Sequence, residues 1–148
     1  MKRLNKKGFT LVELLAVIVV LALLMVVAAS SIGSALTNAK KNTLKTEAQK
    51  IVTNVYQNAY SQYMLNGNIG GLTGYTSVAA VGTTGYKITG TDGKYSFIVK
   101  VDKQGNVTGY CVNYNTSELS IKEATITATG AYTISDSATI AEAACTLS

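Results

Sequence analysis

The sequence of 148 residues predicts an α+β fold: one long N-terminal α-helix with a hydrophobic first half, packed on a small antiparallel β-sheet of about three to four strands. Two patterns predict the helix. An unbroken apolar run covers Leu14–Ala29, and an amphipathic pattern continues from Thr37 to Met64, with no proline between them. A third pattern predicts the sheet, because beyond the glycine-rich segment 67–74 short runs rich in Thr, Tyr, Val and Ile are bounded by glycine.

The first eight residues carry a concentrated positive charge. Lys2, Arg3, Lys6 and Lys7 lie there without an acidic residue, whereas the whole chain has a net charge of +5. The remainder from Phe9 onward is therefore close to neutral, and its lysines are scattered, so there is no strong nucleic-acid signal. A basic segment before an apolar one is a targeting pattern. The positive-inside rule predicts a cytoplasmic N-terminus and a C-terminus outside.

The apolar run predicts a membrane-spanning helix. Leu14–Ala29 contains no polar residue, and extending it back to Phe9 adds only Thr10 and Glu13. As a helix this segment would be about 30 Å long, which matches one hydrocarbon core. An ordinary secretory signal, removed near Ala28–Ser34, is the alternative. Two features argue against it: helical character continues beyond the run, and Glu13 places a carboxylate where lipid makes it unfavourable.

The junction between the basic and apolar segments matches a known pattern. Residues 6–15 read Lys-Lys-Gly-Phe-Thr-Leu-Val-Glu-Leu-Leu. They closely resemble the class III signal of type IV pilins and their relatives, a short basic leader ending in glycine and followed by Phe-Thr-Leu-x-Glu-Leu. The resemblance covers about the first thirty residues. It implies that a membrane-embedded prepilin peptidase cleaves between Gly8 and Phe9, and that Phe9 is then N-methylated.

The resemblance also implies an organisation and a function. Residues 1–8 are expected to be the leader peptide, residues 9–36 the transmembrane and polymerisation helix, and residues 37–148 an extracellular pilin-like head that includes the second half of the helix. The single-pass precursor in the cell membrane would yield a structural subunit of a type IV pilus or pilus-like filament at the cell surface. A type II secretion pseudopilin is the nearest alternative. Another is a secreted or membrane-anchored binding domain that never polymerises.

The implied partners are copies of the chain itself, prepilin peptidase, an inner-membrane assembly platform with its ATPase, and membrane lipid before assembly. In this scheme Glu13 is an assembly determinant. After cleavage it lies about 6 Å along the helix from the free ammonium of Phe9. In the family the acid pairs with the N-terminal amine of a neighbouring subunit, which sets the axial register. An interfacial acid without a partner is the alternative.

The second half of the predicted helix has one apolar face. Its members recur with helical spacing: Leu44, Ala48, Ile51, Val52, Val55, Ala59 and Tyr63. We therefore expect a single helix from about Phe9 to Met64, whose outer half lies on the sheet. Many pilins carry a proline in the apolar segment, and this chain has none. The serines and the glycine within Ser30–Ser34 predict a local soft point instead.

Three strands and two hairpin turns follow. The strands are expected at Gly85–Thr89, Lys94–Val101 and Val107–Tyr114, with turns at 91–93 and 103–106. Alternating side chains of the second strand share a face suited to packing on the helix: Tyr95, Phe97, Val99 and Val101. A fourth strand is expected within Ile121–Thr129.

The two cysteines predict a disulfide. Cys111 falls on the third predicted strand and Cys145 lies near the C-terminus. Because the head is expected to face outside, where disulfides form, the bond would pin the C-terminal tail and contribute about 3–4 kcal/mol. The resemblance supports it, since many type IV pilins close a C-terminal loop in this way. Two buried free thiols are the alternative.

The composition argues against an enzyme. The chain has no histidine, which excludes Ser-His-Asp triads, His-based acid–base chemistry and most zinc or copper sites. Two cysteines are too few for an iron–sulfur cluster or a four-cysteine zinc site. No pair of acids and no nucleophile–base arrangement stands out. We therefore expect no catalytic residues, no metal site and no cofactor.

Overall fold

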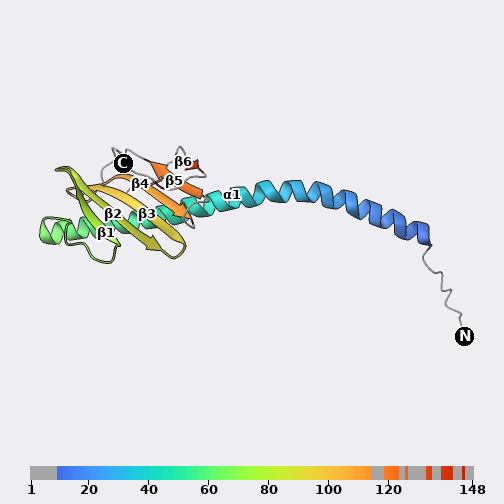
Figure 1. Cartoon of the computed structure of the whole chain (residues 1–148), viewed down its shortest axis with the longest axis horizontal. Coiled ribbons are helices and arrows are strands. Elements are labelled where there is room, and N and C mark those ends of the chain that lie inside the picture. Colours follow the sequence, from blue (N-terminus) through green and yellow to red (C-terminus); the bar gives the residue numbers. More distant parts are fainter. Residues whose placement is uncertain are drawn as a thin grey trace, which may run out of the picture. The chain divides into compact units, whose positions relative to one another are not determined.

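The computed structural model describes residues 10–114, 119–123, 126, 133–134, 138–141 and 145, except for the side chains of Ser30 and Ser31 (Figure 1). The chain divides into two compact units, Met1–Ala39 and Lys40–Ser148. The first unit contains the N-terminal part of helix α1. The second contains the remainder of α1 and the sheet, and is called the head below.

Helix α1 extends from Leu11 to Asn66, a continuous helix of 56 residues. It confirms the prediction of one helix from about Phe9 to Met64, although Phe9 itself lies outside the described residues. The backbone remains helical through the predicted soft point at Ser30–Ser34, because no proline removes a hydrogen bond there. The helix ends at Gly67, whose φ of 72° only glycine adopts readily and whose N–H closes the last turn at 2.8 Å.

The head contains one antiparallel sheet whose strands follow one another in sequence order (Figure 1). Its six strands are β1 (Ser77–Val81), β2 (Gly85–Asp92), β3 (Tyr95–Asp102), β4 (Val107–Tyr114), β5 (Leu119–Glu123) and β6 (Thr139–Ala141). β2, β3 and β4 confirm the three predicted strands, and the turn at 103–106 lies where predicted. β2 continues to Asp92, three residues beyond its predicted end, so the first turn lies at 93–94 and not at 91–93. The fourth predicted strand is β5, which begins two residues before the predicted range and ends at Glu123.

Within the described residues the sheet has six strands, two or three more than the expected three to four. β1 reads Ser-Val-Ala-Ala-Val and is almost wholly exposed, so it shows no alternation of apolar and polar residues. Its position is set by pairing with β2, in which Val81 faces Gly85 across the intervening turn. β6 has three residues, which is too short for a periodic pattern. Strands of this kind are specified by their neighbours rather than by their own residues.

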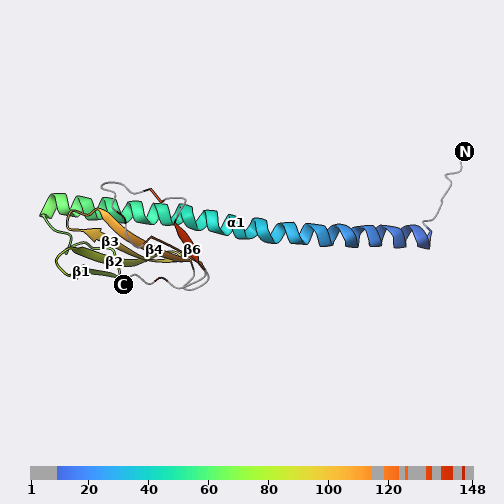
Figure 2. The same ribbon diagram turned by 90° about the horizontal axis from the view of Figure 1, so that it is seen from above.

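The core of the head lies between α1 and one face of the sheet, as predicted. Figure 2 shows the second half of the helix lying along the strands. The predicted helix face is buried from Leu44 to Ala59, with Tyr63 half-buried at its end. On β3 the alternating residues Phe97, Val99 and Val101 are buried against it. Burial of this apolar surface is what holds the helix on the sheet.

The β3–β4 turn packs directly against the helix backbone through Gly105. Its φ is 91°, and a Cβ at this position would lie 2.7 Å from the backbone nitrogen of Tyr60. The carboxylate of Asp102 stabilises the turn: Oδ1 accepts hydrogen bonds from the N–H groups of Gln104 (2.9 Å) and Asn106 (2.8 Å). The turn is therefore fixed both internally and against α1.

The described residues beyond β5 are tied to the rest of the head. Ile126 and Ile134 are buried in the core. The N–H of Ile126 donates to the carbonyl of Thr108 (2.8 Å), and the N–H of Ile134 donates to the side-chain oxygen of Gln49 on α1. These contacts attach the chain after β5 to both layers.

Candidate functional site

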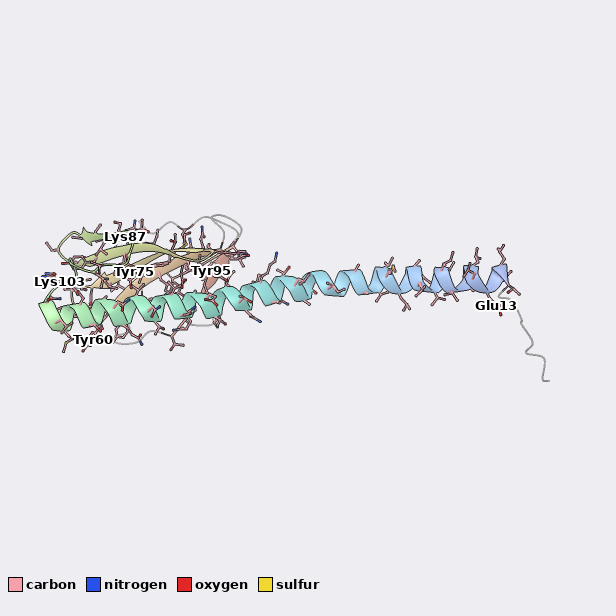
Figure 3. The ribbon with its side chains drawn as sticks, turned by 90° about the horizontal axis from the view of Figure 1, so that it is seen from below. Glu13, Tyr60, Tyr75, Lys87, Tyr95 and Lys103 are labelled. Atoms are coloured by element: carbon pink, nitrogen blue, oxygen red, sulfur yellow. A yellow bond between two sulfur atoms is a disulfide. The ribbon has the colours of Figure 1, made fainter. Side chains whose placement is uncertain are left out.

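The first turn of α1 contains a reciprocal pair of hydrogen bonds between Thr10 and Glu13. The backbone N–H of Thr10 (2.9 Å) and its hydroxyl (2.8 Å) both donate to Oε2 of Glu13. In return the N–H of Glu13 donates to Oγ1 of Thr10 (3.3 Å). This is a capping box, in which each side chain satisfies a backbone N–H that the helix leaves open. Figure 3 shows Glu13 at this end of the helix.

The second carboxylate oxygen of Glu13 is available to another molecule. Oε1 accepts no hydrogen bond from a described residue, and Glu13 forms no ion pair within the described part of the chain. The neighbouring side chains are apolar and exposed, with Leu11 81% and Val12 72% accessible. A carboxylate in such surroundings can bind an ammonium group by a charge-assisted hydrogen bond.

The helix surface that follows Glu13 is apolar and exposed. All side chains of Leu14–Ala29 are exposed, among them Met25 and Val27, each 69% accessible. The described residues contain one helix that is long and apolar enough to cross a membrane, and it is α1. A surface of this kind is stable in lipid or against other apolar helices.

The predicted site residues are placed as follows. Gly8 and Phe9, the expected cleavage and methylation positions, lie outside the described residues. Cys111 and Cys145 are joined by the predicted disulfide, with an S–S distance of 2.07 Å and a Cα–Cα distance of 5.6 Å. Cys111 is fully buried in the middle of β4, so the bond anchors Cys145 to the sheet. The described residues contain no group of three or more His, Cys, Asp or Glu that could hold a metal ion.

The role of Thr10 is new relative to the sequence analysis. The sequence Thr10-Leu-Val-Glu13 directly before an apolar run is a capping-box signature, S/T-x-x-E. This signal could have identified Thr10 as the residue that holds the Glu13 carboxylate.

One long stretch of the head's sequence is uncharged. The chain contains no Asp, Glu, Lys or Arg from Ile51 to Tyr86, a stretch that includes the end of α1, the following loop and β1. Exposed apolar side chains lie on it, including Met64 (65%) and Leu65 (81%). Exposed apolar side chains such as these can contribute to a contact with another macromolecule.

The comparison with protein families found one match, to the prokaryotic N-terminal methylation motif, over residues 3–29. No curated protein and no solved structure matches the chain. The motif and the exposed apolar helix together fit a membrane-anchored precursor. The motif favours a structural subunit over an enzyme. The chain thus carries a type IV pilin-like N-terminus, and this motif indicates a precursor of the pilin-like or pseudopilin kind.

Proposed function

We propose that prepilin peptidase cleaves this precursor between Gly8 and Phe9, and that the mature subunit polymerises into a type IV pilus or pilus-like extracellular filament. The observation that carries this proposal is the first half of α1. It is an exposed apolar helix with a single carboxylate in its first turn, and residues 11–29 of it lie within the methylation motif. An ordinary signal peptide is removed, whereas cleavage after Gly8 leaves this helix in the mature protein.

The helix serves two environments in succession. Before assembly its apolar side chains lie in the lipid, where the internal hydrogen bonds of the helix satisfy the backbone. In the filament the same side chains pack against helices of other copies. The apolar side chains of the helix therefore stay buried while the subunit leaves the bilayer. Exposing them to water would cost about 25 cal/mol for each Å² of apolar surface, which disfavours any water-exposed intermediate.

Glu13 gives this otherwise uniform apolar surface a fixed register. Its Oε2 is held by Thr10, which orients the carboxylate and leaves Oε1 for a donor from outside. The proposed donor is the methylated N-terminal ammonium at Phe9 of a neighbouring subunit. In apolar surroundings an unpaired carboxylate is unfavourable. The Glu13 carboxylate and the neighbouring ammonium can pair at one axial offset between the two helices, so other offsets are disfavoured.

The head supplies the outer part of the filament. The exposed apolar side chains of Met64 and Leu65, at the end of α1, can contact other subunits there. The disulfide between Cys111 and Cys145 suits an oxidising extracellular location. Assembly of this kind requires the peptidase, an inner-membrane platform and its ATPase, which we propose as partners.

A pseudopilus of a type II secretion system uses a leader of the same kind and is the nearest alternative. A binding domain that never polymerises is the alternative of a different class. Mass spectrometry of the mature chain separates the last alternative from our proposal. We expect a first residue of N-methylated Phe9 in cells with active prepilin peptidase, and the uncleaved precursor in cells that lack it. A mature N-terminus at Ser30 or later would contradict the proposal.

A further inference from the structure

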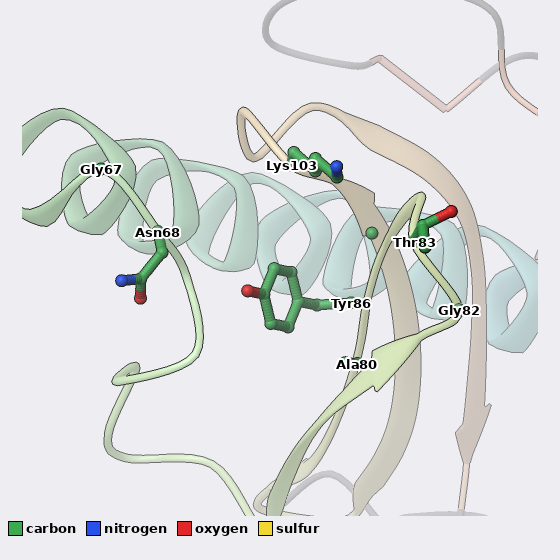
Figure 4. Close-up of a pocket in the computed structure, with 8 residues that line it drawn as sticks. Gly67, Asn68, Ala80, Gly82, Thr83, Tyr86 and Lys103 are labelled. Carbon is green, nitrogen blue, oxygen red and sulfur yellow. The ribbon is translucent and has the colours of Figure 1, made fainter.

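One end of the head contains an open pocket of about 220 Å³ (Figure 4). It is formed by three segments that are distant in sequence: the loop after α1, the β1–β2 turn and the β3–β4 turn. Each segment contributes one polar side chain, namely Asn68, Thr83 and Lys103. Figure 4 shows the ring of Tyr86, from the start of β2, among them.

The ring of Tyr86 is left uncovered on the side of the sheet edge. Its cross-strand partner on β3 is Val101, which is buried, but its partner on β1 is Ala80, which offers only a methyl group. The loop after α1 approaches the far end of the ring, since a Cβ at Gly70 would lie 3.7 Å from the Tyr86 hydroxyl. The pocket therefore has an aromatic surface with space beside it.

The polar side chains around the Tyr86 ring form no hydrogen bonds or ion pairs with one another. Within the described residues, the side chains of Asn68, Thr83 and Lys103 and the Tyr86 hydroxyl make no hydrogen bond or ion pair. The neighbouring acid, Asp102, forms no ion pair with Lys103 within the described residues, and its two oxygens accept hydrogen bonds from Gln104 and Asn106 in its own turn. Lys103 is the one charged residue among the described residues that line this pocket.

From this arrangement we infer that the pocket binds an acidic monosaccharide of the hexuronate class. The C–H face of a sugar ring packs on an aromatic ring, its hydroxyls pair with the amide of Asn68 and the hydroxyl of Thr83, and its carboxylate pairs with Lys103. The volume of about 220 Å³ lies below the usual range for small-molecule sites, about 300–1,000 Å³, and suits a ligand of one ring. A bare phosphate would leave the aromatic surface unused.

A second pocket of the head provides a contrast. Its volume is about 280 Å³, and it lies between α1, the loop at Tyr75 and the β2–β3 turn. Among the described residues that line it there is no Lys or Arg, and Asp92 adds a carboxylate that would repel an acid. Its Asn58 amide already donates to the Tyr75 hydroxyl (2.8 Å). An acidic sugar is therefore expected at the Lys103 pocket rather than here.

Saturation-transfer NMR of the full-length chain in detergent tests this site, with sodium glucuronate as the probe. Glucuronate should bind, and glucose should bind at least about tenfold more weakly, as expected for the loss of one charge-assisted hydrogen bond. Lys103→Gln should weaken glucuronate binding about tenfold, whereas Lys94→Gln, in the β2–β3 turn, should leave it unchanged. Ala80→Leu fills the space beside Tyr86 and should abolish binding of both sugars.

The inference would be overturned if glucuronate did not bind at saturating concentration, or if glucose bound as tightly as glucuronate. It would also be overturned if Lys103→Gln and Lys94→Gln weakened glucuronate binding equally, or if inorganic phosphate bound more tightly than glucuronate. The site lies entirely on the head and does not depend on the proposed polymerisation. Each test uses the unassembled chain, so its outcome is independent of whether filaments form.

Discussion

The packing of the β3–β4 turn on α1 can be tested by replacing Gly105 with alanine. The φ of 91° places an L-residue in a left-handed conformation that costs about 1–2 kcal/mol. The added Cβ would also lie 2.7 Å from the nitrogen of Tyr60 and 2.9 Å from the carbonyl carbon of Ala59, so turn or helix must shift. Overpacking of this kind adds about 1–3 kcal/mol. Gly105→Ala should therefore lower the free energy of unfolding by about 2–5 kcal/mol.

Gly93→Ala is the matched control, because Gly93 has a φ of 57° and a Cβ there meets no atom within 4 Å. It should lose only the conformational part, about 1–2 kcal/mol. Thermal unfolding of the full-length chain in detergent, followed by the near-UV circular dichroism of the tyrosines, measures both variants. For a domain of this size we expect Gly105→Ala to unfold about 5–15 °C below Gly93→Ala. Equal Tm values would refute the packing of this turn on α1.

Three further predictions concern other contacts. Cys145→Ser opens the disulfide that spans 34 residues and should lower the free energy of unfolding by about 3–4 kcal/mol in urea titrations; no loss would show that it does not anchor the tail. Burial raises the pKa of Tyr95 above 10.0, and the Glu47 carboxylate adds to this. The Tyr95 hydroxyl therefore loses its proton at a lower pH in the unfolded chain than in the folded chain. Its contribution to the free energy of unfolding is constant below about pH 10 and is lost as the pH rises through the pKa of the folded state. Tyr95→Phe should reduce this alkaline loss in urea titrations at pH 8 and 11, and an unchanged loss would contradict the assignment. Thr10→Val removes the capping box and should speed amide exchange in the first turn about fivefold, which corresponds to about 1 kcal/mol; unchanged exchange would contradict the cap.

The parts of the fold that the sequence predicts are those with a repeating burial pattern. The helix face from Leu44 to Ala59 and the alternating side chains Phe97, Val99 and Val101 are buried as expected. Each of these segments packs one face against the same core. The spacing of its apolar residues therefore predicts both the type of secondary structure and the buried face. The disulfide was predictable because a chain with two cysteines allows one intramolecular pairing.

The parts that sequence reasoning missed depend on neighbours in space. β1 has no alternation because both of its faces are largely exposed, and it is a strand only by pairing with β2. The Lys103 pocket requires the loop at Asn68, the β1–β2 turn and the β3–β4 turn to meet at one end of the sheet, which no local pattern specifies. Thr10 differs from these, since its capping-box signature was present in the sequence.

Filament content after mechanical shearing of cells tests the proposed role of the N-terminal helix most directly. Wild-type chain, Glu13→Gln and Glu47→Gln would be compared by electron microscopy and by immunoblot of the sheared fraction, with mass spectrometry of the mature N-terminus. Glu47 is a matched control on the same helix, paired with Lys50 at 3.6 Å. We predict that all three chains are processed to Phe9 and that only Glu13→Gln fails to enter filaments. Filaments of Glu13→Gln at the wild-type level, or no filaments from the processed wild-type chain, would contradict this role.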